Sequence, residues 1–393
     1  MPPIRESERA FPGKQFNYLQ FILACLLAST LAQAQVDVEP RRTLQFQIGF
    51  PASGGDERVY PIPYFWFNQK DLPWKGAALR LIYAGLFVDS EVSWFLPSSP
   101  KTVIGGGLGG GPLANLITPY VNDEPLSRQE FNVGSIGVRI LAERELANLR
   151  VGDEQGLPLN VRLTYAIARG LFSRSGSTAE FVLPPSFSTQ SVLAEFRLGG
   201  IEPGLTAARG LEVYTSAEEG FRSGFRAFGP EGAPYPEHDR YRTALVSLAA
   251  KIPVARSVYS VRLAGAWGEG MDELSAWKVG GNCLGVEPFL YPLHSYYTQE
   301  FLAEDFGILN LAWSHQILDD HRLAVHVYAD RAAMLLVPPN LKKWYDRSGV
   351  GAGIGFRGPG SLDWLVSYGD GINANHDGGR GNQEFAVALE RAF

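Results

Sequence analysis

The sequence predicts an all-β protein, an antiparallel transmembrane β-barrel of about 16 strands. The chain ends in a segment whose side chains alternate between large apolar residues and small or acidic ones. Its first residues have the pattern of an export signal, and no later segment offers the run of about 18 apolar residues that a membrane helix needs. An exported chain of this kind is either soluble or a barrel. The length and repeated alternation of its strands favour the barrel over a sandwich.

The terminal strand, Asn382 to Phe393, carries the clearest alternation. Successive side chains of a strand point to opposite faces. One face here is mostly large and apolar, and the other holds alanines and two glutamates, as expected for lipid outside and a wet lumen inside. Bacterial outer-membrane barrels often end on such an aromatic strand. We therefore interpret Phe385 and Phe393 as a signal for the cell's barrel-assembly machinery. Arg391 lies on the lipid face close to the terminus, where it can reach the headgroups.

Residues 1–34 have the parts of a secretory signal peptide. Basic residues, among them Arg5 and Lys14, precede an apolar run over Phe21–Leu31 that is too short to span a bilayer as a helix. A small-x-small cleavage site follows at Ala32-Gln33-Ala34. We expect a short N-terminal segment over 35–42 and a barrel over 43–393, with no separable soluble domain.

Composition excludes some classes of protein. The net charge of −6 does not suggest a nucleic-acid partner. Of the two cysteines, Cys25 leaves with the signal peptide and Cys283 then has no intrachain partner, so a disulfide scaffold is excluded. The 44 glycines and the 12% aromatic content suit many strands joined by turns.

Strands are clearest in the last third of the chain, where lipid-facing apolar residues alternate with small or polar ones. Aromatic residues near the strand ends suit the interfacial girdles of a membrane barrel. The strongest predicted strands are Ser257–Gly268 and those around Leu309–Gln316, Arg322–Asp330 and Leu362–Gly369. Plausible earlier strands are Thr43–Phe50, Val59–Phe67, Ala77–Phe87, Phe131–Ile140, Asn160–Ala168, Ser191–Leu198, Leu211–Tyr214 and Tyr241–Lys251.

Two stretches are predicted to be long loops. Pro97–Arg128 contains a glycine-rich run over Gly105–Gly111, and no Lys-Ser/Thr follows it, so a phosphate-binding P-loop is excluded. We interpret this run as a flexible surface loop or a strand hinge. The second predicted loop is Glu269–Glu304.

Three segments in the last part of the chain carry a family resemblance. The second loop opens with WKVGGNCLG over Trp277–Gly285, a later segment reads VYADRA over Val327–Ala332, and the third-last strand reads DRSGVGAGIGFR over Asp346–Arg357. In this order, ahead of an aromatic terminal strand, they resemble the barrel domain of the bacterial surface-antigen family, which includes the BamA and TamA outer-membrane assembly proteins. The resemblance covers roughly residues 241–393.

The resemblance implies that the second loop folds back into the lumen, with Gly280 and Gly281 at its base. The resemblance places Asp330, Ser348, Gly349, Gly351 and Gly353 inside the barrel beside this loop. Strand alternation adds the lumenal polar residues Arg262, Arg322 and His326. An inward row without side chains leaves space for the backbone of the in-folded loop. Alternatively, these glycines only let the sheet kink and curve.

The chain departs from the family pattern at two points. The arginine that the family carries in this loop is missing, because no arginine occurs over 269–305, and we expect Arg322, Arg262, Arg347 or water to compensate the charge of Asp330. Ala332 replaces the family glycine. The family's periplasmic POTRA repeats, which bind clients and partner subunits, are expected to be absent, which puts a direct role in inserting other barrels in doubt.

No catalytic site, metal site or cofactor is predicted, and we expect the protein not to be an enzyme. His326, Tyr328 and Asp330 share a face of one strand, where neighbours lie about 7 Å apart, too far for a direct hydrogen bond. No G-x-S-x-G or H-E-x-x-H motif occurs.

The expected function is outer-membrane biogenesis or macromolecule export in a Gram-negative-type outer membrane, through a barrel whose first and last strands pair weakly. The expected partners are outer-membrane lipid, the assembly machinery during insertion and an unidentified periplasmic protein. Two alternatives stay open. One is a passive channel or porin. The other is a scaffold for peptidoglycan machinery, because residues 54–67 faintly resemble the MipA/OmpV barrels.

Overall fold

The structure is a computed structural model, and it describes residues 41–51, 60–84, 87–121, 124–151, 155–201, 209–281, 290–296, 300–318, 323–337, 343–359, 362–376 and 380–392. The predicted signal peptide, nearly all of the N-terminal segment 35–42, Arg322 and Phe393 lie outside these residues. Among the described residues, no helix is long and apolar enough to cross a membrane.

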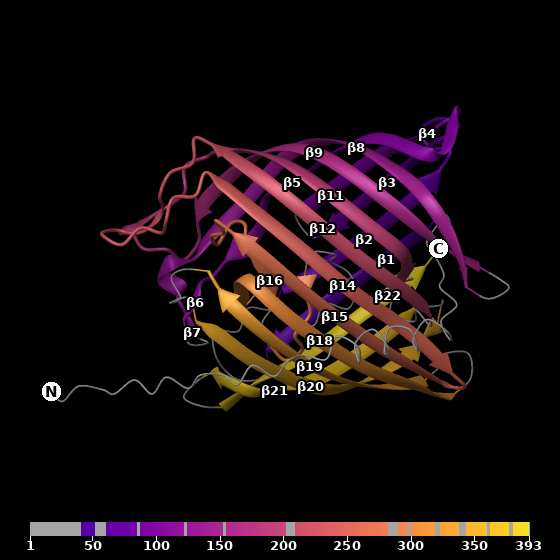
Figure 1. Cartoon of the computed structure of the whole chain (residues 1–393). Helices are drawn as coiled ribbons and strands as arrows, with labels where there is room; N and C mark the ends of the chain where they lie inside the picture. Colours follow the sequence, from indigo (N-terminus) through magenta and orange to yellow (C-terminus); the bar gives the residue numbers. More distant parts are fainter. Residues whose placement is uncertain are drawn as a thin grey trace, which may run out of the picture.

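Within the described residues, sixteen antiparallel strands form a closed barrel, as the sequence predicts, and run obliquely around it (Figure 1). They are β1 (Arg41–Pro51), β2 (Tyr60–Lys70), β3 (Ala77–Ala84), β4 (Phe87–Leu96), β5 (Ser99–Ile117), β8 (Phe131–Val151), β9 (Gln155–Arg174), β11 (Ser188–Ile201), β12 (Gly210–Ser223), β14 (Arg240–Val254), β15 (Ser257–Glu269), β18 (Phe301–Leu318), β19 (Leu323–Leu336), β20 (Trp344–Arg357), β21 (Asp363–His376) and β22 (Arg380–Ala392).

The barrel closes where β1 pairs with β22. The register runs from Thr43 opposite Ala392 to Pro51 opposite Glu384, nine consecutive pairs without a shift. β21 and β22 also pair over nine consecutive residues, from Asp363 to Gly371, before their register shifts. The expected weak pairing of the terminal strands is therefore not visible as a shortened register.

Outward-facing side chains explain why these segments form membrane strands. Ile136, Val138 and Ile140 alternate along β8 with inward residues and are 64%, 51% and 65% exposed. Leu108 on β5 and Val246 on β14 are similarly exposed, at 62% and 58%. An apolar belt of this extent suits hydrocarbon rather than water.

The predicted loop over Pro97–Arg128 is wrong for most of its length, because β5 occupies Ser99–Ile117. β4 was not predicted either, and the strand predicted over Ala77–Phe87 ends at Ala84. Glycines hide the strand because they contribute no side chains to an alternating pattern. The glycine-rich run is a wall strand paired with β4 and β8.

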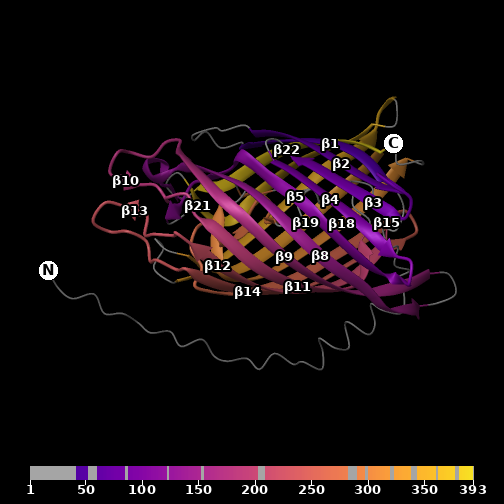
Figure 2. The ribbon, with the colours of Figure 1, turned by 90° about the horizontal axis from the view of Figure 1, so that it is seen from above.

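Long connections gather at one end of the barrel. They include β6 (Tyr120–Val121), β7 (Glu124–Pro125), a 3₁₀ turn over Ser127–Gln129, β10 (Phe181–Val182) and β13 (Gly229–Pro230). Figure 2 shows β10 and β13 beyond one end of the strands. The aromatic side chains of these connections pack into one buried cluster with residues from the strand ends, which we name the cap; it contains Ile117, Phe131, Phe181, Phe187, Phe225, Phe228, Tyr235, Met271, Ala276, Leu302 and Val337.

Candidate functional site: a segment folded into the lumen

The described part of the connection between β15 and β18, residues 270–281, 290–296 and 300, folds into the barrel, and we name it the in-folded segment. β16 (Trp277–Val279) pairs antiparallel with β18 and parallel with β17 (Leu290–Tyr291). Gly280 and Gly281 have φ values of 123° and 84°, in the region that favours glycine. The N–H of Gly280 donates to the carbonyl of Tyr291 and joins the two described parts of the segment.

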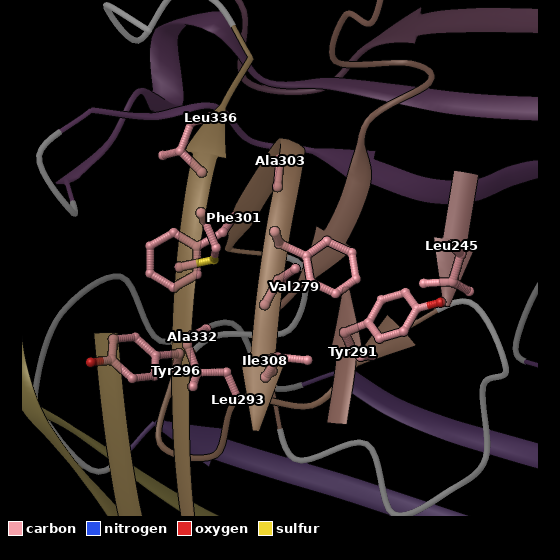
Figure 3. Close-up of a cluster of buried hydrophobic side chains, with 13 residues drawn as sticks. Leu245, Val279, Tyr291, Leu293, Tyr296, Phe301, Ala303, Ile308, Ala332 and Leu336 are labelled. Atoms are coloured by element: carbon pink, nitrogen blue, oxygen red, sulfur yellow. The ribbon is translucent and has the colours of Figure 1, made fainter. Parts of the chain in front are cut away.

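Apolar burial holds the segment against the wall. Tyr291, Leu293 and Tyr296 are 2%, 0% and 0% exposed, and they join a cluster with Ile308 of β18 and Met334 of β19. Figure 3 shows the labelled members of this cluster lying together between strands of the sheet. Burying each such side chain contributes about 1.5–3 kcal/mol.

A buried polar contact ties the segment to β19, and we name it the latch. The backbone N–H of His294 donates to Asp330 Oδ2 at 2.9 Å, and His294 Nδ1 contacts the same oxygen. Asn310 donates to Asp330 Oδ1 at 2.8 Å, and the Asp330 side chain is fully buried. The His294 ring also stacks on Tyr328, with 3.9 Å between ring centroids.

The latch perturbs the histidine. Burial by itself disfavours the imidazolium, but the Asp330 carboxylate, its hydrogen bond and the charge of Glu384 outweigh burial, so the pKa of His294 is raised. His294 thus stands where we expected an arginine or water beside Asp330. Sequence reasoning missed it because a strand pattern gives no position for a loop residue in the lumen.

Further contacts reach the last three strands of the barrel. Ser295 N–H donates to Glu384 Oε2 of β22 at 3.1 Å. The Tyr296 hydroxyl donates to the carbonyl of Ser348 on β20 at 3.1 Å and lies 3.3 Å from Asn373 Oδ1 of β21. The segment therefore contacts β20, β21 and the closing strand β22 as well as β19.

The inward glycines of β20 serve two different purposes. A Cβ on Gly349 would lie 2.2 Å from the backbone oxygen of His294, so the in-folded backbone does occupy the space that this glycine leaves. A Cβ on Gly351 would meet the Tyr328 ring at 2.2 Å, and one on Gly353 would meet the Val366 carbonyl at 2.8 Å. Of these inward glycines, Gly349 leaves space for the in-folded segment, whereas Gly351 and Gly353 leave space for residues of the neighbouring strands.

The other predicted polar residues lie near the segment or apart from it. Arg262 of β15 stacks on Tyr291, with its guanidinium carbon 5.3 Å from the ring centroid. His326 lies over Gly355, where a Cβ would be 2.7 Å from its Nε2. Arg347 packs over Tyr345. Among the described residues, the side-chain partners of Asp330 are His294 and Asn310, and neither Arg262 nor Arg347 is one of them. Phe385 is 37% exposed, as expected on the lipid face.

A second lumenal feature, the ion network, lines the wall over the glycine-rich strand. Arg139 of β8 contacts Asp89 and Glu91 of β4 by reaching across β5, and a Cβ on Gly107 would lie 2.9 Å from its guanidinium carbon. Arg162 Nη2 donates to Glu91 Oε2 at 2.6 Å, and Arg80 donates to the same oxygen at 3.0 Å. Gly107 and Gly109 of β5 therefore leave room for charged side chains of the neighbouring strands. Sequence reasoning missed this network, whose only signal was the inward alternation of charged residues.

The two sides of the lumen differ in access to solvent. The side chains of Arg80, Arg139 and Arg162 are 29%, 19% and 19% exposed. On the opposite side, Asp330 and Tyr296 are completely covered. Water thus reaches the wall with the ion network, while the in-folded segment covers the wall that it contacts.

Solved structures with similar folds are outer-membrane barrels. CdiB from Acinetobacter baumannii matches with a TM-score of 0.56 and 9% identity over 91% of this chain and 61% of that chain. BamA from Haemophilus ducreyi lacking POTRA domains 1–3 matches with a TM-score of 0.56 and 11% identity over 99% of this chain and 80% of that chain. CdiB from Escherichia coli matches with a TM-score of 0.52 and 11% identity, over 89% and 63% of the two chains.

These likenesses define the fold as that of an outer-membrane β-barrel of the BamA and CdiB type. They confirm, for the fold, the resemblance found in the sequence motifs. The chain spans about three fifths of the CdiB chain from Acinetobacter baumannii. No family model matches the sequence, and no curated protein matches it.

Proposed function

We propose that this protein is an outer-membrane barrel that acts in membrane biogenesis or macromolecule export, with the in-folded segment as its movable internal element. The observation that carries the proposal is the latch, His294 on Asp330, in a barrel with the fold of BamA and CdiB. A segment fixed by a few polar contacts and a modest apolar patch can be both stable and releasable, since each part is worth only a few kcal/mol.

The contact between Ser295 and Glu384 supports the same proposal. It places the segment against β22, the strand whose pairing with β1 closes the barrel. Release of the segment would remove a hydrogen bond from the closing strand. Through this contact, movement of the segment would act on the strand that closes the barrel.

Depletion of the protein in its own bacterium tests this function. We expect quantitative proteomics to show loss of other barrel proteins from the outer membrane, or loss of particular polypeptides from the medium, after depletion. Re-expression of the parent protein should restore the profile, and a variant with the segment cross-linked to β19 should not. An unchanged outer-membrane and secreted proteome would contradict the proposal.

A passive channel is the second candidate, and the ion network favours it. Its arginines are accessible to solvent in the lumen, which suits the passage of small charged solutes. This function predicts slower solute uptake on depletion with an unchanged proteome, so the same experiment separates the two candidates.

A further inference from the structure

Glu273 is a buried carboxyl group at the root of the in-folded segment. Glu273 follows β15 and the turn at Gly270, and it is only 1% exposed. Met271 and Ala276, on either side of it, are members of the cap. Glu273 therefore lies where the in-folded segment and the aromatic cap meet.

Within the described part of the chain, neither carboxylate oxygen of Glu273 has a hydrogen-bond partner. The adjacent Asp272 contrasts with it. Arg222 Nη2 donates to Asp272 Oδ1 at 3.0 Å, Arg222 Nη1 contacts Oδ2, and the backbone N–H of Leu274 donates to Oδ1 at 3.0 Å. A buried charge without such partners is costly, so the surroundings of Glu273 favour its neutral form.

The charged and titratable groups around Glu273 do not favour its ionisation. Burial raises the pKa of Glu273 well above its usual value, and the negative charge of Asp272 raises it further. Tyr235, from the connection between β12 and β14, opposes this effect but donates its hydroxyl hydrogen to Gln129 Oε1 at 2.6 Å. Arg222 of β12 is engaged with Asp272, and Glu130 accepts hydrogen bonds from Ser175 and Thr118.

We propose that Glu273 is a proton-binding switch of the cap, which packs tightly when this carboxyl is neutral and loosens when it is ionised. The cap connects segments that are distant in sequence. Phe131, Phe181 and Phe228 pack on one another with ring centroids 5.6 and 6.0 Å from Phe131. Ionised Glu273 would need water, and water can reach it only if this packing opens.

The sign of the pH dependence follows from linkage. In the open cap, Glu273 has an ordinary carboxyl pKa of about 4.3. In the closed cap its pKa is higher, so the carboxyl stays protonated at pH values where the open cap has already released the proton. Between these two pKa values each unit of rising pH therefore favours opening about tenfold. Acidic conditions keep the cap closed, and neutral to alkaline conditions loosen it.

Hydrogen exchange of the full-length refolded protein tests the switch. Exchange is measured at pH 5, 6, 7 and 8 and normalised to the intrinsic chemical rate at each pH, for peptides covering residues 224–239 and 270–276. We expect exchange in the parent to rise by about tenfold per unit over part of this range. Glu273→Gln, which keeps the shape and removes the titration, should abolish the rise. Glu231→Gln, at an exposed carboxyl of the same connections, should keep it.

Two outcomes would overturn the proposal: a parent cap whose normalised exchange does not change with pH, or a Glu273→Gln protein with the same pH dependence as the parent. If Glu273→Gln does not fold, Glu273→Leu provides the second test, because leucine has a similar size and no titratable group. The normalised exchange of Glu273→Leu should not change with pH. A rise with pH like that of the parent would contradict the role of Glu273.

Discussion

Removal of the Asp330 carboxylate should release the in-folded segment. In Asp330→Ala the backbone N–H and ring of His294 and the amide of Asn310 lose their acceptor together. Breaking a buried, hydrogen-bonded pair costs about 3–5 kcal/mol, because the remaining partner stays desolvated. A cost of this size increases the population of the released segment by roughly 10²- to 4 × 10³-fold.

Native-state hydrogen exchange of the peptide covering residues 290–296 measures this population directly. Asp330→Ala should raise its exchange by the same factor and leave β8 and β9 unaffected. Asp346→Asn is the matched control, because the side chains of its ion pair with Arg331 are mostly exposed, at 52% for Asp346 and 71% for Arg331, and exposed ion pairs contribute little to stability. Equal exchange in Asp330→Ala and the parent would refute the latch as the contact that holds the segment.

Three further predictions follow from the same geometry. Because the pKa of His294 is raised, the latch is strongest below about pH 6.5 and weakens as pH rises through the folded-state pKa. Hydrogen exchange of the in-folded segment should therefore rise with pH in the parent, and rise less in His294→Gln. Gly349→Ala places a Cβ 2.2 Å from the His294 carbonyl and should lower the free energy of unfolding by about 1–3 kcal/mol in thermal-unfolding measurements. The control Gly307→Ala, whose Cβ would have nothing within 4 Å, should be nearly neutral. Equal melting temperatures for the two variants would contradict the contact between Gly349 and His294. Glu91→Gln removes the carboxylate charge that Arg80, Arg139 and Arg162 share. We expect it to lower the free energy of unfolding by about 1–3 kcal/mol, a range reduced because these side chains are partly exposed, as measured by urea unfolding in detergent. An unchanged urea midpoint would rule out a stabilising ion network.

The barrel was predictable because the membrane imposes a simple rule on side chains. Lipid on one face and a narrow lumen on the other force alternation with period two, and the segments around Ser257, Leu323 and Phe385 follow it closely. The strand count and the in-folded position of the connection after β15 were also predicted correctly. The wall and the main connection could thus be read from local patterns.

The incorrect predictions have a common physical cause, because each depends on residues that lie elsewhere in the sequence. The glycine-rich run of β5 was interpreted as a loop, although two of its glycines, Gly107 and Gly109, make room for Arg139, which lies more than 25 residues away in the sequence. The partner of Asp330 was sought among wall arginines, and it is His294, a residue of the connection itself. The alternation of side chains shows which face of a wall strand points to the lumen. It does not show which side chain from another part of the chain contacts that face.

Conductance in a planar bilayer tests the central claim, that the segment fills one side of the lumen and is held there. The refolded parent should be closed or flickering, or pass only small currents along the ion network. The variant lacking residues Val286 to Thr298, which include the latch histidine, should conduct strongly and steadily. A large steady conductance in both proteins would contradict the internal plug and favour a porin-like channel.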